Sequence, residues 1–268
     1  MTVLVLTMAA PLGLLLAYSL WRQDGLFIDT RLTLAEYAAL VSDPGFAVVF
    51  LRSLAIAAVA SIAAILLAYP VAWFIAFRAR AKFLWLLLVT IPFWTSYLLR
   101  VFAWKVILGY NGLINSGLMA LHLVSAPVTF LLYNPVAVVL TLIHGYAPFA
   151  VLPIYVALEK IDPALLEAAA DLGDSPARRF LRVTLPLSMS GVIAAFVLMF
   201  VPATGDYVTP SLVGGANGLM VANLIQAQFG RADNWPLGAA MAITTIAAVS
   251  LLSVFAAAGA RCAAGRIR

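Results

Sequence analysis

The amino-acid sequence predicts an all-α membrane protein with six transmembrane helices and both termini in the cytoplasm. Three observations support this fold class. Of the 268 residues, 65% are hydrophobic and only 10% are charged, whereas a soluble domain is about 25% charged. The mean hydropathy of +1.06 leaves too few charges to cover a surface that faces water. Long uncharged stretches also recur along the chain, and a helix satisfies its own backbone polar groups in lipid.

The six spans are placed in the uncharged stretches, since a helix needs about 20 mostly apolar residues to cross a bilayer. The stretch Met1–Trp21 carries no charge, and we interpret it as a retained span rather than a cleaved signal peptide. The stretch Lys105–Glu159 is too long for one helix, and Asn-Gly and Asn-Pro pairs break it so that one span is left. The predicted spans are 2–21, 53–77, 83–99, 135–157, 185–205 and 235–260.

The basic residues of the loops set the expected orientation, because Lys and Arg accumulate on the cytoplasmic side. With the N-terminus inside, ten of the 16 basic residues fall in inner segments. The remaining six are matched by six acids outside. The whole chain, 1–268, is therefore expected to form one membrane domain whose long cytoplasmic loop is 159–186. The stretch 207–230, rich in Gly and Asn, is expected to be an outer loop.

Several kinds of chemistry are missing from the sequence. It contains no Gly-x-x-x-x-Gly-Lys-Ser/Thr phosphate loop, no His-Glu-x-x-His and no Gly-x-Ser-x-Gly. Two separated histidines and one cysteine offer no metal cluster, so no metal site is expected. No charged residue falls near the middle of a predicted span, where proton-driven carriers place theirs. The sequence favours a membrane pathway that has no catalytic residues, no cofactor and no nucleic-acid partner. The alternative is a self-sufficient secondary transporter or channel.

The loop between the fourth and fifth spans predicts two short helices joined at a glycine. Asp162 and Pro163 form a helix start, Gly173 is a left-handed stop, and Ser175 with Pro176 repeats the start. One interpretation is an amphipathic hairpin that lies on membrane lipid. The other is an elbow that docks on a soluble partner, which the acidic, Ala-rich first arm favours.

The same loop resembles a known family. Glu167-Ala168-Ala169, three residues, Gly173, nine residues and Val183-x-Leu185-Pro186 are similar to the EAA loop of permease subunits of ABC importers, with Val in place of Ile. The resemblance implies a type I importer fold in the bacterial inner membrane, with the elbow inserted into a groove of an ATPase. The residues that it assigns to this coupling are Glu167, Ala168, Ala169, Asp171, Gly173, Arg178, Leu185 and Pro186.

The resemblance also implies partners. Two copies of a cytoplasmic ATPase subunit would bind ATP and Mg, so this chain would hold no cofactor and catalyse nothing itself. A second permease chain, similar or identical, and an external solute-binding protein would complete the transporter. Residues 91–115, Gly205-Asp206-Tyr207 and Asp233–Pro236 are similar to spermidine/putrescine-type permeases. Polyamines are the implied solutes, and other small solutes, such as opines, phosphonates or iron, remain open.

A path for a flexible polycation should combine carboxylates with aromatic faces. Trp94 and Tyr97 are three residues apart in the predicted third span and are expected on one helical face. Trp104 follows at the outer rim, and Asp206 with Tyr207 stands at the outer end of the fifth span. The alternatives are structural: aromatic residues near span ends form interfacial belts, and an aspartate there is a boundary charge or a hydrogen-bond acceptor.

Two further features have open roles. His144 is a polar residue in the fourth span, where it faces the path or bonds a neighbouring helix. Residues 29–50 alternate charged and apolar side chains, which predicts an outer amphipathic element. Such an element lodges at the membrane interface or contacts a delivering binding protein.

Overall fold

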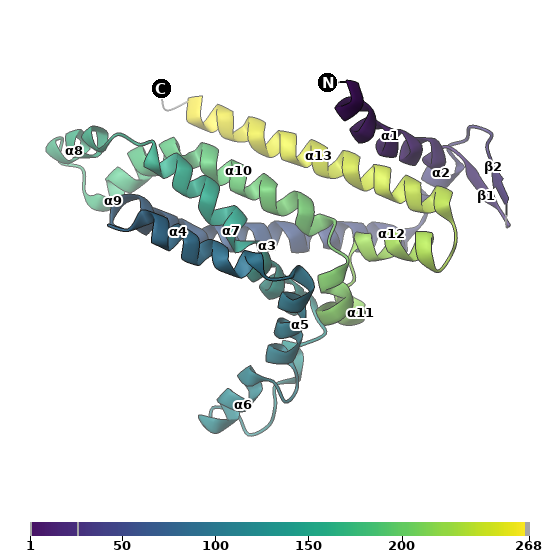
Figure 1. The fold of residues 1–268 in the computed structure, drawn as a ribbon, viewed down its shortest axis with the longest axis horizontal. Coiled ribbons are helices and arrows are strands. Elements are labelled where there is room, and N and C mark those ends of the chain that lie inside the picture. Colours follow the sequence, from purple (N-terminus) through teal and green to yellow (C-terminus); the bar gives the residue numbers. More distant parts are fainter. Residues whose placement is uncertain (1, 26, 266–268) are drawn as a thin grey trace.

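The computed structural model describes residues 2–25 and 27–265 as a bundle of long helices with short elements gathered near its ends (Figure 1). A two-stranded antiparallel hairpin, in which Gln23 pairs with Ile28, is the only sheet in the described part of the chain. The elements in order are α1 Thr2–Ser19, β1 Arg22–Asp24, β2 Phe27–Asp29, α2 Ala35–Ser42, α3 Pro44–Phe77, α4 Lys82–Thr90, the 3-10 helix η1 Ile91–Trp94, α5 Tyr97–Leu108, α6 Leu113–Ala120, the 3-10 helix η2 Thr129–Leu131, α7 Pro135–Glu159, α8 Pro163–Asp171, α9 Pro176–Arg179, the π-helix η3 Phe180–Thr184, α10 Leu185–Thr204, the π-helix η4 Pro210–Gly214, α11 Gly215–Gly218, α12 Val221–Gly230 and α13 Trp235–Gly265.

The centre of the bundle is formed by α3, α7 and α10, which pack against one another. Lipid provides no hydrophobic drive for helices to associate, so close packing of small residues must hold them together. On α3, alanines at helical spacing are buried; they are Ala57, Ala60, Ala64, Ala68 and Ala72. Where α10 crosses α7, a Cβ on Gly191 would lie 2.5 Å from the Ala157 Cβ and from the Pro153 carbonyl oxygen. Only glycine fits this crossing.

The remaining long helix, α13, packs against α10, α12 and α1. It runs back along the bundle, so its C-terminal end lies near the end that carries α8, while the β1–β2 hairpin lies at the opposite end (Figure 1). The salt bridge between Lys82 and Glu159, with 3.0 Å between Nζ and Oε1, joins the start of α4 to the end of α7. The segment between α3 and α4 therefore lies at the α8 end as well.

Four helices in the described residues are long and apolar enough to cross a membrane: Pro44–Phe77, Pro135–Glu159, Pro176–Thr204 and Trp235–Ala258. A bent pair, Lys82–Trp94 with Tyr97–Ala120, makes a fifth if it is counted as one span. The apolar part of α1, Ala9–Ser19, is shorter. The structure thus supports an all-α membrane protein with four or five apolar spans, where the sequence predicts six.

The third predicted span, 83–99, is not one straight helix. After α4, Pro92 lies in the 3-10 turn η1, and Thr95 is extended with ψ of 151°. The chain then enters α5 at 86° to the preceding segment. The prediction of one helix is wrong because a proline and a following extended residue interrupt the backbone hydrogen bonds, although the apolar composition continues.

Three other bounds differ from the predictions. The second long helix begins at Pro44 instead of 53, because the Asp43 carboxylate accepts from the Gly45 amide at 2.8 Å and caps it. The fifth begins as early as Pro176, since α9, η3 and α10 form one continuous helical segment. The stretch 207–230 is not a loop: it contains η4, α11 and α12.

Candidate functional site

Asp206 anchors a polar cluster just beyond the end of α10. Its Oδ1 accepts hydrogen bonds from the backbone amides of Val208, at 2.8 Å, and Thr209, at 3.2 Å. The carboxylate thus caps the helical turn that leads into η4, as an aspartate does at a helix start. Only 7% of Asp206 is exposed. A charged group that is buried this deeply requires partners for all its oxygens.

The second carboxylate oxygen of Asp206 is bonded by side chains. The phenol of Tyr97, at the start of α5, donates to Oδ2, and the Thr209 hydroxyl donates to the same oxygen at 2.6 Å. The Tyr97 and Thr209 hydroxyls are themselves 2.6 Å apart. Tyr146 of α7 completes the cluster, with its ring centroid 5.9 Å from that of Tyr97. The structure therefore brings Tyr97 and Asp206 together, and it adds Thr209 and Tyr146, which sequence analysis did not select.

Arg100 lies behind Tyr97, one helical turn further along α5, and is only 9% exposed. Its Nη1 donates to the carbonyl oxygen of Gly145 at 3.0 Å. The guanidinium carbon is 5.3 Å from the ring centroid of Phe93 and 5.6 Å from that of Tyr97, which are cation–π distances. Its Nε is buried and finds no hydrogen-bond partner among the described residues. Tyr97 thus contacts a buried cation with its ring and the carboxylate of Asp206 with its hydroxyl.

The position of Arg100 corrects the prediction that charges stay away from the middle of the spans. Gly145 is the eleventh of the 25 residues of α7, so Arg100 lies near the middle of that helix. The predicted orientation counts Arg100 among the six basic residues of the outer side. The available signal was its spacing of three from Tyr97, which puts both side chains on one face of a helix.

The other predicted path residues do not join this cluster as a group. Trp94 is 77% exposed and lies in η1, across the chain break from Tyr97, so the expectation that the two share a helical face is wrong. Tyr207 is 48% exposed. The indole of Trp104 meets the ring of His144 edge-on, at 5.6 Å between centroids, which links α5 to α7. This contact supports the helix-bonding interpretation of His144.

The elbow forms from the local signals in its sequence. The Asp162 carboxylate accepts from the Ala164 amide at 2.9 Å and caps α8. Gly173 ends α8 with φ of +83°, and the Asp174 amide donates back to the Ala169 carbonyl at 3.0 Å, a Schellman-type stop. The second helix, α9, is capped by Ser175.

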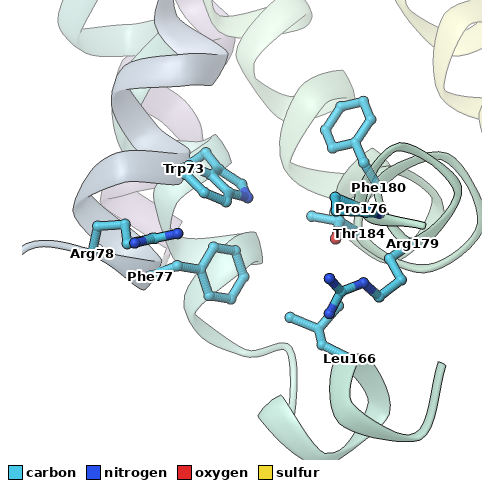
Figure 2. Close-up of a pocket in the computed structure, with 8 residues that line it drawn as sticks. All are labelled: Trp73, Phe77, Arg78, Leu166, Pro176, Arg179, Phe180 and Thr184. Carbon is cyan, nitrogen blue, oxygen red and sulfur yellow. The ribbon is translucent and has the colours of Figure 1, made fainter. Parts of the chain in front are cut away.

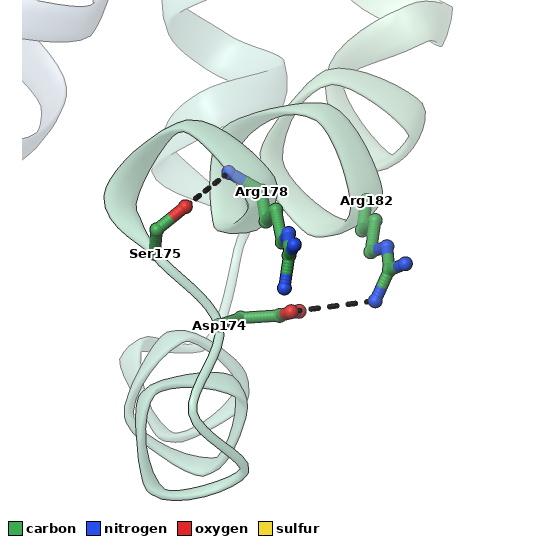
Figure 3. A network of polar contacts seen from close by, with 4 residues as sticks. All are labelled: Asp174, Ser175, Arg178 and Arg182. Carbon is green, nitrogen blue, oxygen red and sulfur yellow. Dashed lines mark hydrogen bonds and ion pairs between the residues drawn. The ribbon is translucent and has the colours of Figure 1, made fainter.

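The start of the second arm is held by two polar contacts (Figure 3). The Ser175 hydroxyl oxygen accepts from the Arg178 amide at 3.4 Å. The Asp174 carboxylate lies beside the guanidinium of Arg182, with 3.3 Å between Oδ1 and Nη1. Both partners follow Gly173, so this ion pair ties the residue after the bend to η3, and the 68% exposed Arg182 adds little to stability.

The EAA segment presents charge outward and packs one alanine inward. Glu167 and Asp171 are exposed and lie four residues apart, on one face of α8, while Ala169 is buried. Ala168 and Arg178 are exposed as well. Gly173 occupies the bend, and Leu185 and Pro186 are partly buried at the start of α10. An acidic face and an apolar one on a protruding helix are suited to a protein groove.

Residues 53–268 match the model of the family described as binding-protein-dependent transport system inner membrane component. The chain belongs to this family. It is the permease component of an ABC importer, a multi-pass protein of the inner membrane and a non-catalytic subunit. The family assignment explains why a protruding elbow and a membrane bundle occur together without any nucleotide-binding motif.

Curated relatives of this permease match nearly its whole length. The spermidine/putrescine transport system permease protein PotB of Escherichia coli is 38% identical over 234 residues, which is 87% of this chain and 84% of the relative. PotB of Haemophilus influenzae is 38% identical over 93% of this chain and 87% of its own. The inner membrane ABC transporter permease protein YdcU of E. coli is 32% identical over 85% and 76%, respectively.

A solved structure shares the fold of the permease. A chain of a bacterial ABC transporter involved in the import of the acidic polysaccharide alginate superposes with a TM-score of 0.72. The match covers 97% of this chain and 92% of that one, at 16% sequence identity. The fold of the matched residues is therefore that of an ABC importer permease.

Proposed function

We propose that this permease carries a polyamine, or a related small amine, past the Tyr97–Asp206–Thr209 cluster by alternating access. The observation that carries the proposal is the state of Asp206. Four neutral donors satisfy its oxygens, yet neither ion pair found in the described part of the chain includes it. A buried carboxylate without a cation attracts an ammonium group. The 38% identity to spermidine/putrescine permeases supports the same solute class.

Aromatic rings beside the carboxylate suit the rest of such a solute. Tyr97 and Tyr146 present adjacent rings, and a ring face attracts an alkylammonium while its edge packs against methylenes. Arg100 is held by the Gly145 carbonyl and the Phe93 ring, and the described structure contains no ion pair between it and Asp206. This arrangement keeps the guanidinium from neutralising Asp206, so the carboxylate stays available for a transported cation.

A second solute class is favoured by Arg100 itself. Its Nε is buried without a partner and lies in the same cluster as a carboxylate. A zwitterionic amine, such as an opine-like amino acid derivative, would pair its ammonium with Asp206 and its anionic group with Arg100. Competition between spermidine and a zwitterionic amine for uptake separates the two classes.

The elbow is the proposed connection to ATP hydrolysis. The transporter would contain two copies of an ATPase that bind ATP and Mg, a second permease chain and an external solute-binding protein. Closure of the ATPases would move α8 through Glu167, Asp171 and their neighbours, and Gly173 would transmit that motion to α10. The continuity of α9, η3 and α10 supports this route, because a continuous helix passes a push at its end along its length.

The proposed orientation places the α8 end of the bundle in the cytoplasm. The C-terminal end of α13 and the segment 78–82 lie at that same end (Figure 1). These segments carry the basic residues that accumulate on cytoplasmic sides. The β1–β2 hairpin and α2 would then face outward, where the binding protein docks. With α1 and the bent pair each counted as a span, the proposed topology has six spans and both termini inside.

The experiment that tests the proposal compares Asp206→Asn with wild type in the reconstituted transporter. We expect spermidine uptake to fall at least ten-fold while ATPase activity without solute is retained, since the amide keeps the shape and loses the charge. Asp24→Asn, an exposed acid of the outer hairpin, is the matched control and should transport normally. Unchanged uptake in Asp206→Asn would remove this residue from the path. Uptake by the permease without any ATPase would overturn the importer mechanism.

A further inference from the structure

A groove of about 370 Å³ lies between the end of α3 and the elbow. Figure 2 shows residues of α3 on one side of it and residues of α9 and η3 on the other, with Leu166 of α8 below. Its lining residues are Trp73, Phe77, Arg78, Leu166, Pro176, Arg179, Phe180 and Thr184. The groove is therefore mainly aromatic and aliphatic, with an arginine on each side.

The two arginines have no acidic partner in the described structure. The ion pairs found there are Lys82–Glu159 and Arg182–Asp174, and neither includes a residue that lines the groove. The guanidinium of Arg78 lies 6.0 Å from the ring of Trp73, and the buried Nε of Arg179 makes no hydrogen bond to a described residue. Arg78 is exposed at the edge of the groove and Arg179 is half-buried, so the groove offers two guanidinium groups without an acidic partner to an anion.

A second, wholly apolar hollow lies farther along α3 and α10, and the two hollows with the surface between them are called the crease below. It measures about 240 Å³ and is lined by Ile62, Ile65, Leu66, Val192, Ile193, Phe196 and Ala256. Between the two hollows the Tyr69 hydroxyl bonds that of Ser188 at 2.7 Å and holds the helices together. At 1.5 Å per residue, Leu66 lies about 18 Å along α3 from Arg78, close to the roughly 15 Å hydrocarbon depth of one leaflet.

We propose that this crease binds an anionic phospholipid of the inner leaflet. The phosphate lies between Arg78 and Arg179, and an acyl chain follows the crease toward Phe196. The crease matches the two parts of a phospholipid. Its end beside the elbow is basic and aromatic, which suits the headgroup, and its other end, about one leaflet away, is apolar, which suits the acyl chain. A basic pocket between helices at the cytoplasmic side is suited to an anionic headgroup. The site goes beyond the proposed solute path and depends on the proposed orientation only for the leaflet.

A second copy of the chain is the alternative to a phospholipid as the partner of this exposed apolar crease. Its first helix is an apolar segment, but residues 1–21 carry no charged side chain. That helix would fill the apolar hollow and leave both arginines without an anion. The charge of the groove therefore favours a phospholipid over helix packing.

The proposed lipid would bridge the elbow to α3. Leu166 and Pro176 belong to the two arms of the elbow, whereas Trp73 and Phe77 belong to α3, and all four line one groove. A headgroup held there contacts both sides. Loss of the lipid should therefore loosen the elbow and weaken the stimulation of ATP hydrolysis by loaded binding protein.

The test uses the complete transporter, delipidated in detergent and then offered equal amounts of dioleoyl phosphatidylglycerol and dioleoyl phosphatidylcholine. Lipid that stays bound after repurification is measured by mass spectrometry. We expect a preference for phosphatidylglycerol that falls about five-fold in Arg179→Gln, as for the loss of one basic side chain at an anionic surface. Arg182→Gln is the matched control, because it removes the same charge nearby from an exposed side chain that pairs with Asp174. Equal loss in both variants would overturn the site.

Two further measurements make the outcome decisive. Ile193→Trp fills the apolar hollow and leaves both arginines in place, so it should also release the phospholipid; if it does not, the groove holds only a headgroup-sized anion. If Arg179→Gln fails to assemble, acyl-brominated phosphatidylglycerol tests the wild type. It should quench the fluorescence of Trp73, taken as the difference from Trp73→Phe, more than brominated phosphatidylcholine does. Equal quenching, or disulfide crosslinking of Ile193→Cys to a cysteine in the partner permease, would contradict the proposal.

Discussion

The phenol of Tyr97 donates a hydrogen bond to the carboxylate of Asp206, across 109 residues of sequence. This bond joins the start of α5 to the end of α10, which are the two places where long helices of the bundle are interrupted. Irregular backbone at membrane depth is tolerated where it lines a cavity or is buried in protein. The pair thus links two positions at which regular helix gives way to other backbone.

Removing the hydroxyl of Tyr97 while keeping its ring should weaken transport. In Tyr97→Phe the carboxylate loses one hydrogen bond, and bonds to charged groups contribute about 1.5–3 kcal/mol. We expect spermidine uptake to drop about ten-fold, measured as initial rates in proteoliposomes that contain the complete transporter. Tyr110→Phe, at a residue that is 58% exposed, serves as the control. Equal rates for Tyr97→Phe and wild type would mean that the bond has no part in transport.

Replacement of Arg100 should change which solutes are carried. Arg100→Met keeps the length and apolar contacts of the side chain and removes the charge beside the Tyr97 ring. If the solute is a polycation, uptake should persist or rise, because repulsion is removed. If the solute is a zwitterion, uptake should fall at least ten-fold. Uptake of both solute types by wild type and variant decides between the two classes, and a thermal unfolding scan shows whether the variant is folded.

The left-handed bend of the elbow should tolerate glycine alone. Gly173 has φ of +83°, and an alanine there costs roughly 1 kcal/mol or more in backbone strain. We expect Gly173→Ala to lower ATPase stimulation by loaded binding protein several-fold. Gly25→Ala is the matched control, since Gly25 has φ of +60° in the outer hairpin. Similar stimulation in both variants would mean that the bend does not transmit motion.

The crossing of α7 and α10 should be sensitive to one methyl group. Gly191→Ala places a Cβ within 2.5 Å of Ala157 and of the Pro153 carbonyl, so the helices must separate. Overpacking of this kind costs about 1–3 kcal/mol, which should lower the thermal midpoint of the purified permease by several degrees. Gly117→Ala, whose added Cβ meets nothing within 4 Å, should leave the midpoint unchanged or raised. An unchanged midpoint for Gly191→Ala would contradict the packing.

The elbow could be predicted residue by residue because its signals are local. A capping aspartate, a first-turn proline and a terminal glycine each act on a backbone group within four residues, so their spacing specifies the structure. The apolar spans around α3, α7, α10 and α13 could be predicted for a related reason. The bilayer acts as a solvent, and an uninterrupted apolar stretch of sufficient length is enough to predict a span.

The site at Asp206 could be predicted only in part. Tyr97 and Asp206 were selected because both are chemically suited to a cation, but their contact depends on how α5 turns after η1. Thr209 and Arg100 join them for the same geometric reason. Trp94 does not, because the backbone break at Thr95 and Ser96 cancels the helical spacing that would align it with Tyr97.

The sequence by itself determined that this protein is a membrane bundle with an EAA elbow, because composition and local capping act without knowledge of distant residues. The tertiary structure alone decided where the scarce charges end up. It bends the chain by 86° between η1 and α5 and thereby buries Arg100 against Gly145 and brings Tyr97 to Asp206. It also brings Arg179 to the groove edge opposite Arg78. The small number of charges is a property of the composition. Which groups each charge contacts depends on the relative directions of the helices, and only their packing sets those directions.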